Sequence, residues 1–216
     1  MSDPSVDAAQ GGALSDQRVD LPVCSSEVVF DGAIWTVRRD RLAYAGGEIT
    51  REYIDHPGAV AVLVLDEHDR VCLIRQYRHP IRAREWELPA GLLDFAGESA
   101  LSAAQRELAE EVDLVAADWA LLTDFHTSPG GSNESLRVYL ARGVSDAHEV
   151  FARTDEESEI EKCWVALDEV VDAVLDRRVQ NSILAIAVLA AHASRARGWG
   201  SLGDAESPWD RHPLAP

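Results

Sequence analysis

The stretch that decides the fold runs from Glu87 to Leu114 and reads ELPAGLLDFAGESALSAAQRELAEEVDL. Within it, Glu107, Glu110 and Glu111 stand at positions i, i+3 and i+4. On an α-helix this spacing places three carboxylates on one face, where like charges repel each other. A solvated acidic face is one interpretation. A divalent cation site is the other, because hard ions such as Mg²⁺ prefer clustered carboxylate oxygens.

The surrounding residues predict a helix from about Ser99 to Val112, with Ser99 as its N-cap. Leu101, Ala104, Leu108 and Val112 form an apolar stripe that lies about 110° from the acidic face by the 3.6-residue period. Such a helix packs its stripe on a core and presents its carboxylates to a neighbouring cleft.

Composition excludes several classes of protein. A chain of 216 residues is long enough for one domain with an arm and a tail. Its net charge of −18 argues against a nucleic-acid binder or a protein that binds anionic membranes. Cys24, Cys72 and Cys163 lie far apart and show no CxxC spacing, so we expect neither a zinc site nor a disulfide framework.

Targeting signals are not evident in the sequence. The first twenty residues lack the basic and apolar regions of a signal peptide. The longest apolar runs, Ala59–Leu65 and Ile183–Ala191, fall short of the roughly 18 residues needed to span a bilayer. We therefore expect a soluble, cytoplasmic protein.

The pattern along the chain predicts four parts: a disordered leader (1–22), an N-terminal β arm (23–54), a main domain (55–197) and a flexible tail (198–216). Turn signals in the arm separate short strands. In the main domain we expect a strand at Ala59–Leu65 that is buried on both faces, because it is apolar throughout. Further strands are expected at Val71–Tyr77, Trp86–Pro89, Trp119–Phe125, Ser135–Ala141 and Ile160–Ala166, and closing helices at Leu167–Leu175 and Ser182–Arg195.

The central stretch resembles the Nudix box, G-x5-E-x7-R-E-U-x-E-E-x-G-U, where U is a bulky aliphatic residue. Glu98, followed after seven residues by Arg106-Glu107-Leu108-Ala109-Glu110-Glu111, matches this pattern, and Leu114 fills its last aliphatic place. Two positions depart from it. Gly91 lies one residue too far from Glu98, and Asp113 replaces the glycine that ends the helix, although Asp tolerates the left-handed conformation better than most residues.

Further motifs are similar to the bacterial ADP-ribose pyrophosphatase subfamily. They are Arg51-Glu52, His56–Ala59, Arg75–Arg78, Glu87–Gly91, Pro129 fifteen residues beyond the box, and Asn181-Ser182. The resemblance implies an α/β fold, the Nudix α/β/α sandwich with an N-terminal β arm. It also implies a homodimer in which Arg51, Glu52 and Trp35 of the arm serve the partner's active site.

The implied reaction is Mg²⁺-dependent hydrolysis of ADP-ribose to AMP and ribose 5-phosphate, with Mn²⁺ as an alternative cation. The resemblance assigns the metal to Glu107, Glu110, Glu111 and the carbonyl of Ala90. Gly91 and Glu98 then have structural roles in the box. Arg106 is grouped with the catalytic residues, although an ion pair with Glu98 that orients the box is its favoured role.

The resemblance places the general base in an acidic loop, where Glu157 is favoured over Glu156; plain solvation is the other interpretation of this loop. Arg78 and Arg51 are candidates to bind phosphate, because the guanidinium fork matches phosphate oxygens, or they are surface residues. Trp35 stacks on adenine or belongs to the core. Glu134 contacts ribose or is a plain loop residue.

Two other functions stay open. One is a Nudix hydrolase that prefers another nucleoside diphosphate sugar or a dinucleotide, because the box recognises only the pyrophosphate. The other is a Nudix-like module that binds a nucleotide without cleaving it; the retention of Glu107, Glu110 and Glu111 argues against this.

Overall fold

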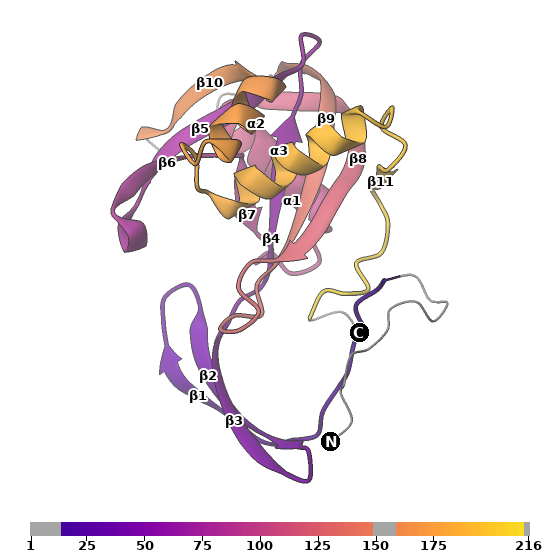
Figure 1. Ribbon diagram of the computed structural model, residues 1–216. Helices are drawn as coiled ribbons and strands as arrows, with labels where there is room; N and C mark the ends of the chain where they lie inside the picture. Colours follow the sequence, from indigo (N-terminus) through magenta and orange to yellow (C-terminus); the bar gives the residue numbers. More distant parts are fainter. Residues whose placement is uncertain (1–13, 149–158, 214–216) are drawn as a thin grey trace.

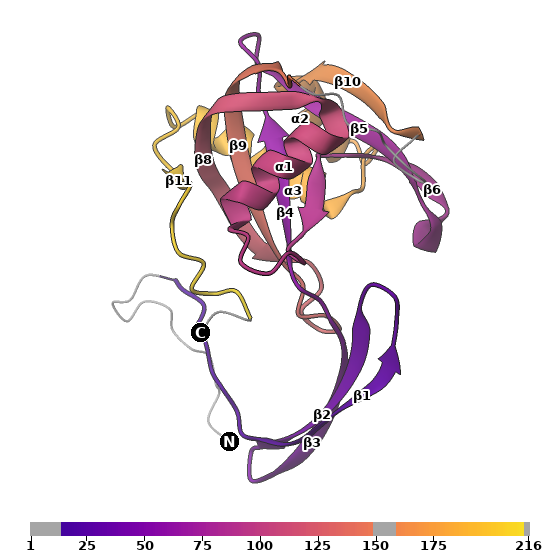
Figure 2. The same cartoon turned by 180° about the vertical axis from the view of Figure 1, so that it is seen from behind.

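A computed structural model describes residues 14–148 and 159–213 of the chain. The main domain has three layers (Figures 1 and 2). Two sheets form its middle, with α1 (Ala100–Val112) on one side and α2 (Leu167–Leu175) and α3 (Ser182–Arg195) on the other. The predicted α/β/α sandwich is confirmed, and both closing helices have the predicted bounds.

The larger sheet has the strand order β11-β8-β9-β4-β7, and the smaller one the order β10-β5-β6. Their bounds are β4 (Ala59–Val64), β5 (Arg70–Arg78), β6 (Ala83–Glu87), β7 (Ala90–Leu92), β8 (Leu114–His126), β9 (Ser135–Asp146), β10 (Glu161–Ala166) and β11 (Gly203–Asp204). A short 3₁₀ helix, η1 (His79–Ile81), joins β5 to β6.

The core lies on both faces of β4, as predicted from its uninterrupted apolar sequence. Val60, Val62 and Val64 pack with the apolar stripe of α1. Ala61 and Leu63 face the opposite way and pack with residues of α2 and α3. Because β4 pairs with β9 on one side and with β7 on the other, it connects the core to the segment that precedes the box.

Helix α1 has the caps that the sequence predicts. The Ser99 hydroxyl accepts a hydrogen bond from the backbone N–H of Ser102 at 3.1 Å, a contact that typically stabilises a helix by about 1 kcal/mol. The helix ends at Asp113, whose φ of 56° is in the left-handed region. Aspartate therefore takes the conformation for which the Nudix pattern has glycine.

Strand β8 begins directly after this cap, five residues before the expected start at Trp119, and β9 continues beyond the expected end at Ala141. The extra residues pair with each other, from Leu114 opposite Asp146 to Asp118 opposite Arg142. Their sequence has weak strand propensity, so the pairing partner decides their conformation.

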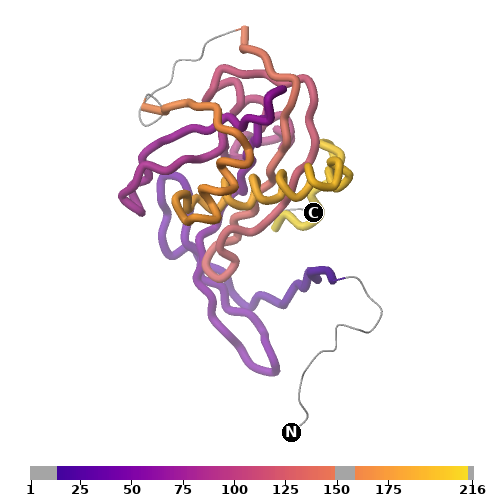
Figure 3. The backbone as a smooth tube through the Cα atoms, turned by 45° about the horizontal axis from the view of Figure 1, so that its top comes forward, coloured from indigo at the N-terminus to yellow at the C-terminus, as the bar shows by residue number. Residues whose placement is uncertain are grey.

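The arm is a separate antiparallel sheet of β1 (Val23–Asp31), β2 (Thr36–Tyr44) and β3 (Gly47–Asp55). A tight turn joins β2 to β3 with positive φ at both central residues, 50° at Ala45 and 80° at Gly46, which suits the twist of a hairpin. The arm extends away from the main domain (Figures 1 and 3). All nine residues of β1 are exposed to solvent.

The C-terminal segment is packed against the main domain. β11 pairs with Leu121 and Ala120 of β8, and the carbonyls of Ser207 and Pro208 accept hydrogen bonds from Arg137. The sequence predicts a flexible tail from Gly198 and does not predict these contacts, because their partners lie about 70 positions away in the chain. No helix in the described residues is long and apolar enough to cross a membrane.

Candidate active site

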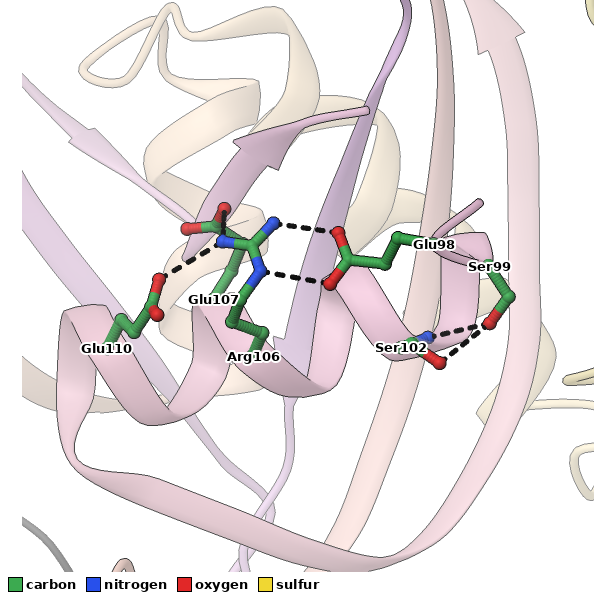
Figure 4. Close-up of polar contacts among 6 residues, drawn as sticks. All are labelled: Glu98, Ser99, Ser102, Arg106, Glu107 and Glu110. Carbon is green, nitrogen blue, oxygen red and sulfur yellow. Dashed lines mark hydrogen bonds and ion pairs between the residues drawn. The ribbon is translucent and has the colours of Figure 1, made fainter. Parts of the chain in front are cut away.

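Arg106 is the centre of a charged cluster on α1 (Figure 4). Its guanidinium binds both oxygens of Glu98, at 3.0 and 2.9 Å, and this fork accounts for the orientation of its plane. Its third nitrogen donates to Glu107 at 2.6 Å and to Glu110 at 3.1 Å. The favoured prediction of an ion pair between Glu98 and Arg106 agrees with this geometry.

The two members of this pair influence each other's ionisation. The hydrogen bonds from Arg106 hold the pKa of the Glu98 carboxyl below its usual value. Hydrogen bonds to Glu98, and then to Glu107 and Glu110, raise the pKa of Arg106, against the opposing effect of burial. The ring of Phe95 lies 4.6 Å from the guanidinium carbon and covers it, which limits access of water. Glu98 and Arg106 therefore stabilise each other's charged form.

Strand β7 holds the other side of the acidic face. The backbone N–H of Ala90 donates to a carboxylate oxygen of Glu111, which is buried, at 2.9 Å. The Glu107 carboxylate lies so close to Gly91 that a Cβ atom at position 91 would overlap it. The helix and the segment before it are thus fitted to each other through carboxylates that point at β7.

The side chains of Glu107, Glu110 and Glu111 suit a hard divalent cation, because the atoms that they offer as ligands are all carboxylate oxygens. A carboxylate offers about four acceptor positions, so the contacts to Arg106 and Ala90 are compatible with a bound cation. Within residues 14–148 and 159–213, no group of three or more His, Cys, Asp or Glu side chains is arranged to hold a metal ion, and this includes the acidic face of α1. Substrate oxygens and the Ala90 carbonyl would have to complete the coordination.

Arg78 is bound to a residue that the sequence did not single out as its partner. Its guanidinium makes two hydrogen bonds to Glu87, at 2.9 and 2.7 Å, and Gln76 donates to the same carboxylate at 3.2 Å. Glu87 is only 4% exposed, whereas the Arg78 side chain is about half exposed. Glu87 therefore fixes the direction of Arg78 at the end of β5.

A polar network joins the arm to the loop between β8 and β9. Asn133 donates to Asp55 and accepts from the backbone N–H of His56, both at 2.7 Å. His56 lies 3.6 Å from Glu134, and the Trp35 ring stands 5.7 Å from the His56 ring. Trp35 is 42% exposed, so the interpretation as a core residue does not apply in this chain. Asn133 is a site candidate that the sequence did not indicate, and His56 was indicated only as part of a subfamily motif.

Beside this network is an open cavity of about 470 Å³. Arg51, Glu52 and Tyr53 of β3 line one side of it, and Pro129 and Asn133 of the loop line another. Glu52 is also bound to Arg39, at 2.6 Å. The structure therefore brings Arg51, Glu52 and Pro129 together, a proximity that the sequence did not predict, and no box carboxylate is among the described residues that line this cavity.

Comparison with known proteins identifies the family of this chain. Residues 55–185 match the model of the NUDIX domain. The chain belongs to the Nudix hydrolase family. The match begins where the arm ends, covers the box, the β8–β9 loop and α2, and ends in the first turn of α3.

Relatives of this Nudix hydrolase carry several names. It is 42% identical over 197 residues to "ADP-ribose pyrophosphatase" of Mycobacterium tuberculosis, covering 91% of this chain and 94% of that protein. It is 32% identical over 164 residues to "Methanol dehydrogenase activator" of Bacillus methanolicus, covering 76% and 88%. A solved structure named "ADP compounds hydrolase" has the same fold, with a TM-score of 0.70, 22% identity, and coverage of 86% of this chain and 99% of that one.

The predicted base of this Nudix hydrolase, Glu157 or Glu156, lies outside the described residues. The first described residues after that segment are bound to the smaller sheet. Glu159 pairs with Arg84, and Glu161 accepts two hydrogen bonds from Arg75. Arg75 belongs to one of the shared subfamily motifs, but neither ion pair was predicted, because the partners lie 75 and 86 positions apart in the chain.

Proposed function

We propose that this Nudix hydrolase uses Mg²⁺, or Mn²⁺ in its place, to hydrolyse ADP-ribose to AMP and ribose 5-phosphate. The observation that carries the proposal is the intact acidic face of α1, with Glu107 and Glu111 directed at β7. The substrate follows from a relative that is named as an ADP-ribose pyrophosphatase. It is 42% identical to this chain, and the alignment covers 91% of the chain.

Glu107, Glu110, Glu111 and the Ala90 carbonyl are the proposed metal ligands, in keeping with the general use of divalent cations by Nudix hydrolases. A bound cation neutralises pyrophosphate charge and positions the attacking water. Arg106, held by Glu98, keeps Glu107 and Glu110 in place and limits their mutual repulsion. Gly91 leaves room for the Glu107 carboxylate.

The remaining roles concern the substrate and the proton. Arg78, oriented by Glu87, supplies a fork for phosphate oxygens. Arg51, Glu52, Trp35 and Glu134 surround or adjoin the arm cavity and hold the rest of the nucleotide. Glu157, or Glu156, is the proposed base that accepts a proton from the attacking water.

We infer a homodimer from the surface of the arm. Phe30 and Ile34 are 62% and 63% exposed, and Val28, Val29 and Trp35 nearby are also exposed. A sheet with this many exposed apolar side chains suits a protein interface. The arm cavity lacks box carboxylates, so a second copy can complete a site by bringing its α1 to this arm.

Two measurements test the dimer. Sedimentation should give twice the chain mass, and Phe30→Asp together with Ile34→Asp should give a folded monomer with at least a tenfold lower kcat/KM. A matched double change at exposed residues of the main domain, Leu175→Asp with Leu189→Asp, should leave the dimer intact. A native chain that sediments as a fully active monomer contradicts the proposal.

A substrate panel tests the reaction. ADP-ribose, other nucleoside diphosphate sugars and dinucleotides are compared by kcat/KM with Mg²⁺, and AMP and ribose 5-phosphate are identified as products. One relative is named as an activator of a dehydrogenase and not as a pyrophosphatase. The panel therefore includes the dinucleotides NAD⁺ and NADH. Faster cleavage of another compound refutes ADP-ribose as the preferred substrate. Binding without cleavage supports the non-catalytic module.

A further inference from the structure

The C-terminal strap, residues 203–213, runs along the main domain from β8 to the base of the arm (Figures 1 and 2). It begins as β11, paired with Leu121 and Ala120. A turn follows, in which Asp204 accepts hydrogen bonds from the N–H groups of Glu206 and Ser207. The strap is therefore guided by backbone contacts at its start.

Arg137 anchors the middle of the strap. This arginine is 3% exposed and makes a two-pronged pair with Asp124, at 2.9 and 2.8 Å. Its remaining donors reach the carbonyls of Ser207, at 2.7 Å, and Pro208, at 3.3 Å. The Trp209 ring covers the guanidinium at 4.7 Å. Removal of the strap would leave buried donors of Arg137 without partners, so the strap is a fixed part of the fold.

The end of the strap reaches the hinge between arm and main domain. The His212 ring packs 4.7 Å from the Trp209 ring and lies against Gly58, so that a Cβ atom at Gly58 would stand 2.5 Å from Nε2. Pro57 and Gly58 connect β3 to β4, and the Gly58 carbonyl accepts from Leu93, next to β7.

Beyond His212, Pro213 lines the arm cavity opposite residues of β3 and the β8–β9 loop. The cavity offers a cation at Arg51, rings at Tyr53 and His126, and hydrogen-bonding groups at Ser132 and Asn133. These groups suit a phosphate, a base and ribose hydroxyls respectively. A volume of about 470 Å³ falls in the range of about 300–1,000 Å³ typical of small-molecule sites.

We propose that the strap determines nucleotide affinity: Pro213 forms a wall of the subsite for the AMP half of the substrate, and His212 and Trp209 hold it there. This proposal rests on the proposed function and assigns a role to a segment outside the matched NUDIX domain, which ends at residue 185. The strap is remote from the box carboxylates in sequence and contacts none of them in the interactions described above. Its effect should therefore fall on nucleotide binding and not on bond cleavage.

Two C-terminal truncations of the otherwise complete protein test the role of the strap. A chain ending at Asp210 loses His212 and Pro213 but keeps the Arg137 anchor, and a chain ending at Pro213 is the matched control. The shorter chain should raise KM for ADP-ribose at least tenfold with kcat changed less than twofold. Inhibition by AMP should weaken by a similar factor, whereas inhibition by ribose 5-phosphate should not change. The control chain should behave as the full chain.

Two point variants separate the wall from general stability. Pro213→Asp places a carboxylate beside the proposed phosphate site, and it should reproduce the rise in KM without lowering the melting temperature. Arg211→Ala removes the contacts of this residue with Ser15 and Asp16 and should leave KM unchanged.

The outcomes distinguish the two proposals. If the full chain cleaves ADP-ribose and both the Asp210 truncation and Pro213→Asp retain its KM, the strap proposal is overturned and the proposed function stands. If the full chain cleaves a different nucleotide compound, ADP-ribose is refuted as substrate, and the same comparison with that compound decides the strap. A loss of kcat with unchanged KM also overturns the strap proposal.

Discussion

The Glu107 carboxylate occupies the space where a side chain at Gly91 would begin. Gly91 is therefore required by contact with the acidic helix, since its own φ is not in the left-handed region. Gly91→Ala must displace Glu107 or β7, and we expect kcat to fall at least tenfold. Steady-state kinetics over a range of Mg²⁺ concentrations measures the effect. Gly200→Ala, where the new Cβ would make only ordinary contact, is the control; equal activity of both variants contradicts this assignment.

The metal ligands are tested by charge. Glu107→Gln and Glu111→Gln keep the size of the side chain and remove its charge, so each should lower kcat by about a hundredfold or more, in line with the several kcal/mol that a catalytic metal supplies. Circular dichroism should show an unchanged fold. Gln105→Glu adds charge to the exposed side of the same helix and should have little effect. Full Mg²⁺-dependent activity in Glu107→Gln refutes the assignment.

Arg106 and Glu98 are expected to act as one unit. The side chains are 24% and 18% exposed, so the loss of either partner leaves a partly buried charge unpaired, at a cost of about 1–3 kcal/mol. Urea unfolding of Glu98→Gln, Arg106→Gln and the double variant measures their coupling. The double variant should be clearly less destabilised than the sum of the single ones. If the destabilisations of the two single variants add up to that of the double variant, the interaction between Glu98 and Arg106 does not contribute to stability.

Asp113 ends α1 with φ of 56°, a conformation that glycine adopts without strain. Both Asp113→Gly and Asp113→Ala remove the carboxylate, so their difference reports the backbone alone. We expect Asp113→Gly to be more stable by about 1 kcal/mol, measured by urea unfolding. Equal stability of the two variants would show that the helix end relaxes out of the left-handed region.

His212 should make stability depend on pH. Burial is the largest effect and lowers its pKa. The backbone of Pro57 opposes burial, the charges of Arg137 and His126 lower the pKa further, and Asp124 has a small opposing effect. The neutral ring is thus favoured in the folded protein. Its contribution is complete above the ordinary pKa of 6.5 and is lost as the pH falls through the lowered value. The melting temperature of the native chain should therefore fall more between pH 7 and pH 5 than that of His212→Gln. His68→Gln, at an exposed turn, should follow the native chain.

Local features of the site were readable in advance. The acidic face, the N-cap at Ser99, the left-handed cap at Asp113 and the pair of Glu98 with Arg106 all depend on residues within about one or two helical turns of each other. Their spacing is set by the helical period, so the sequence alone predicts them. The bounds of α2 and α3 were predictable for the same reason.

The sequence by itself thus determined the family, the order of the layers and the helix with the proposed metal ligands. Only the tertiary structure decided that Glu87 orients Arg78, that Asn133 ties the arm to the β8–β9 loop, and that the C-terminal strap reaches the arm cavity. Asn133 and His56 lie 77 positions apart, and Arg137 and Ser207 lie 70 apart. Such contacts have no periodic signature, because they form only after the sheets and helices have packed and brought distant backbone groups within hydrogen-bonding distance.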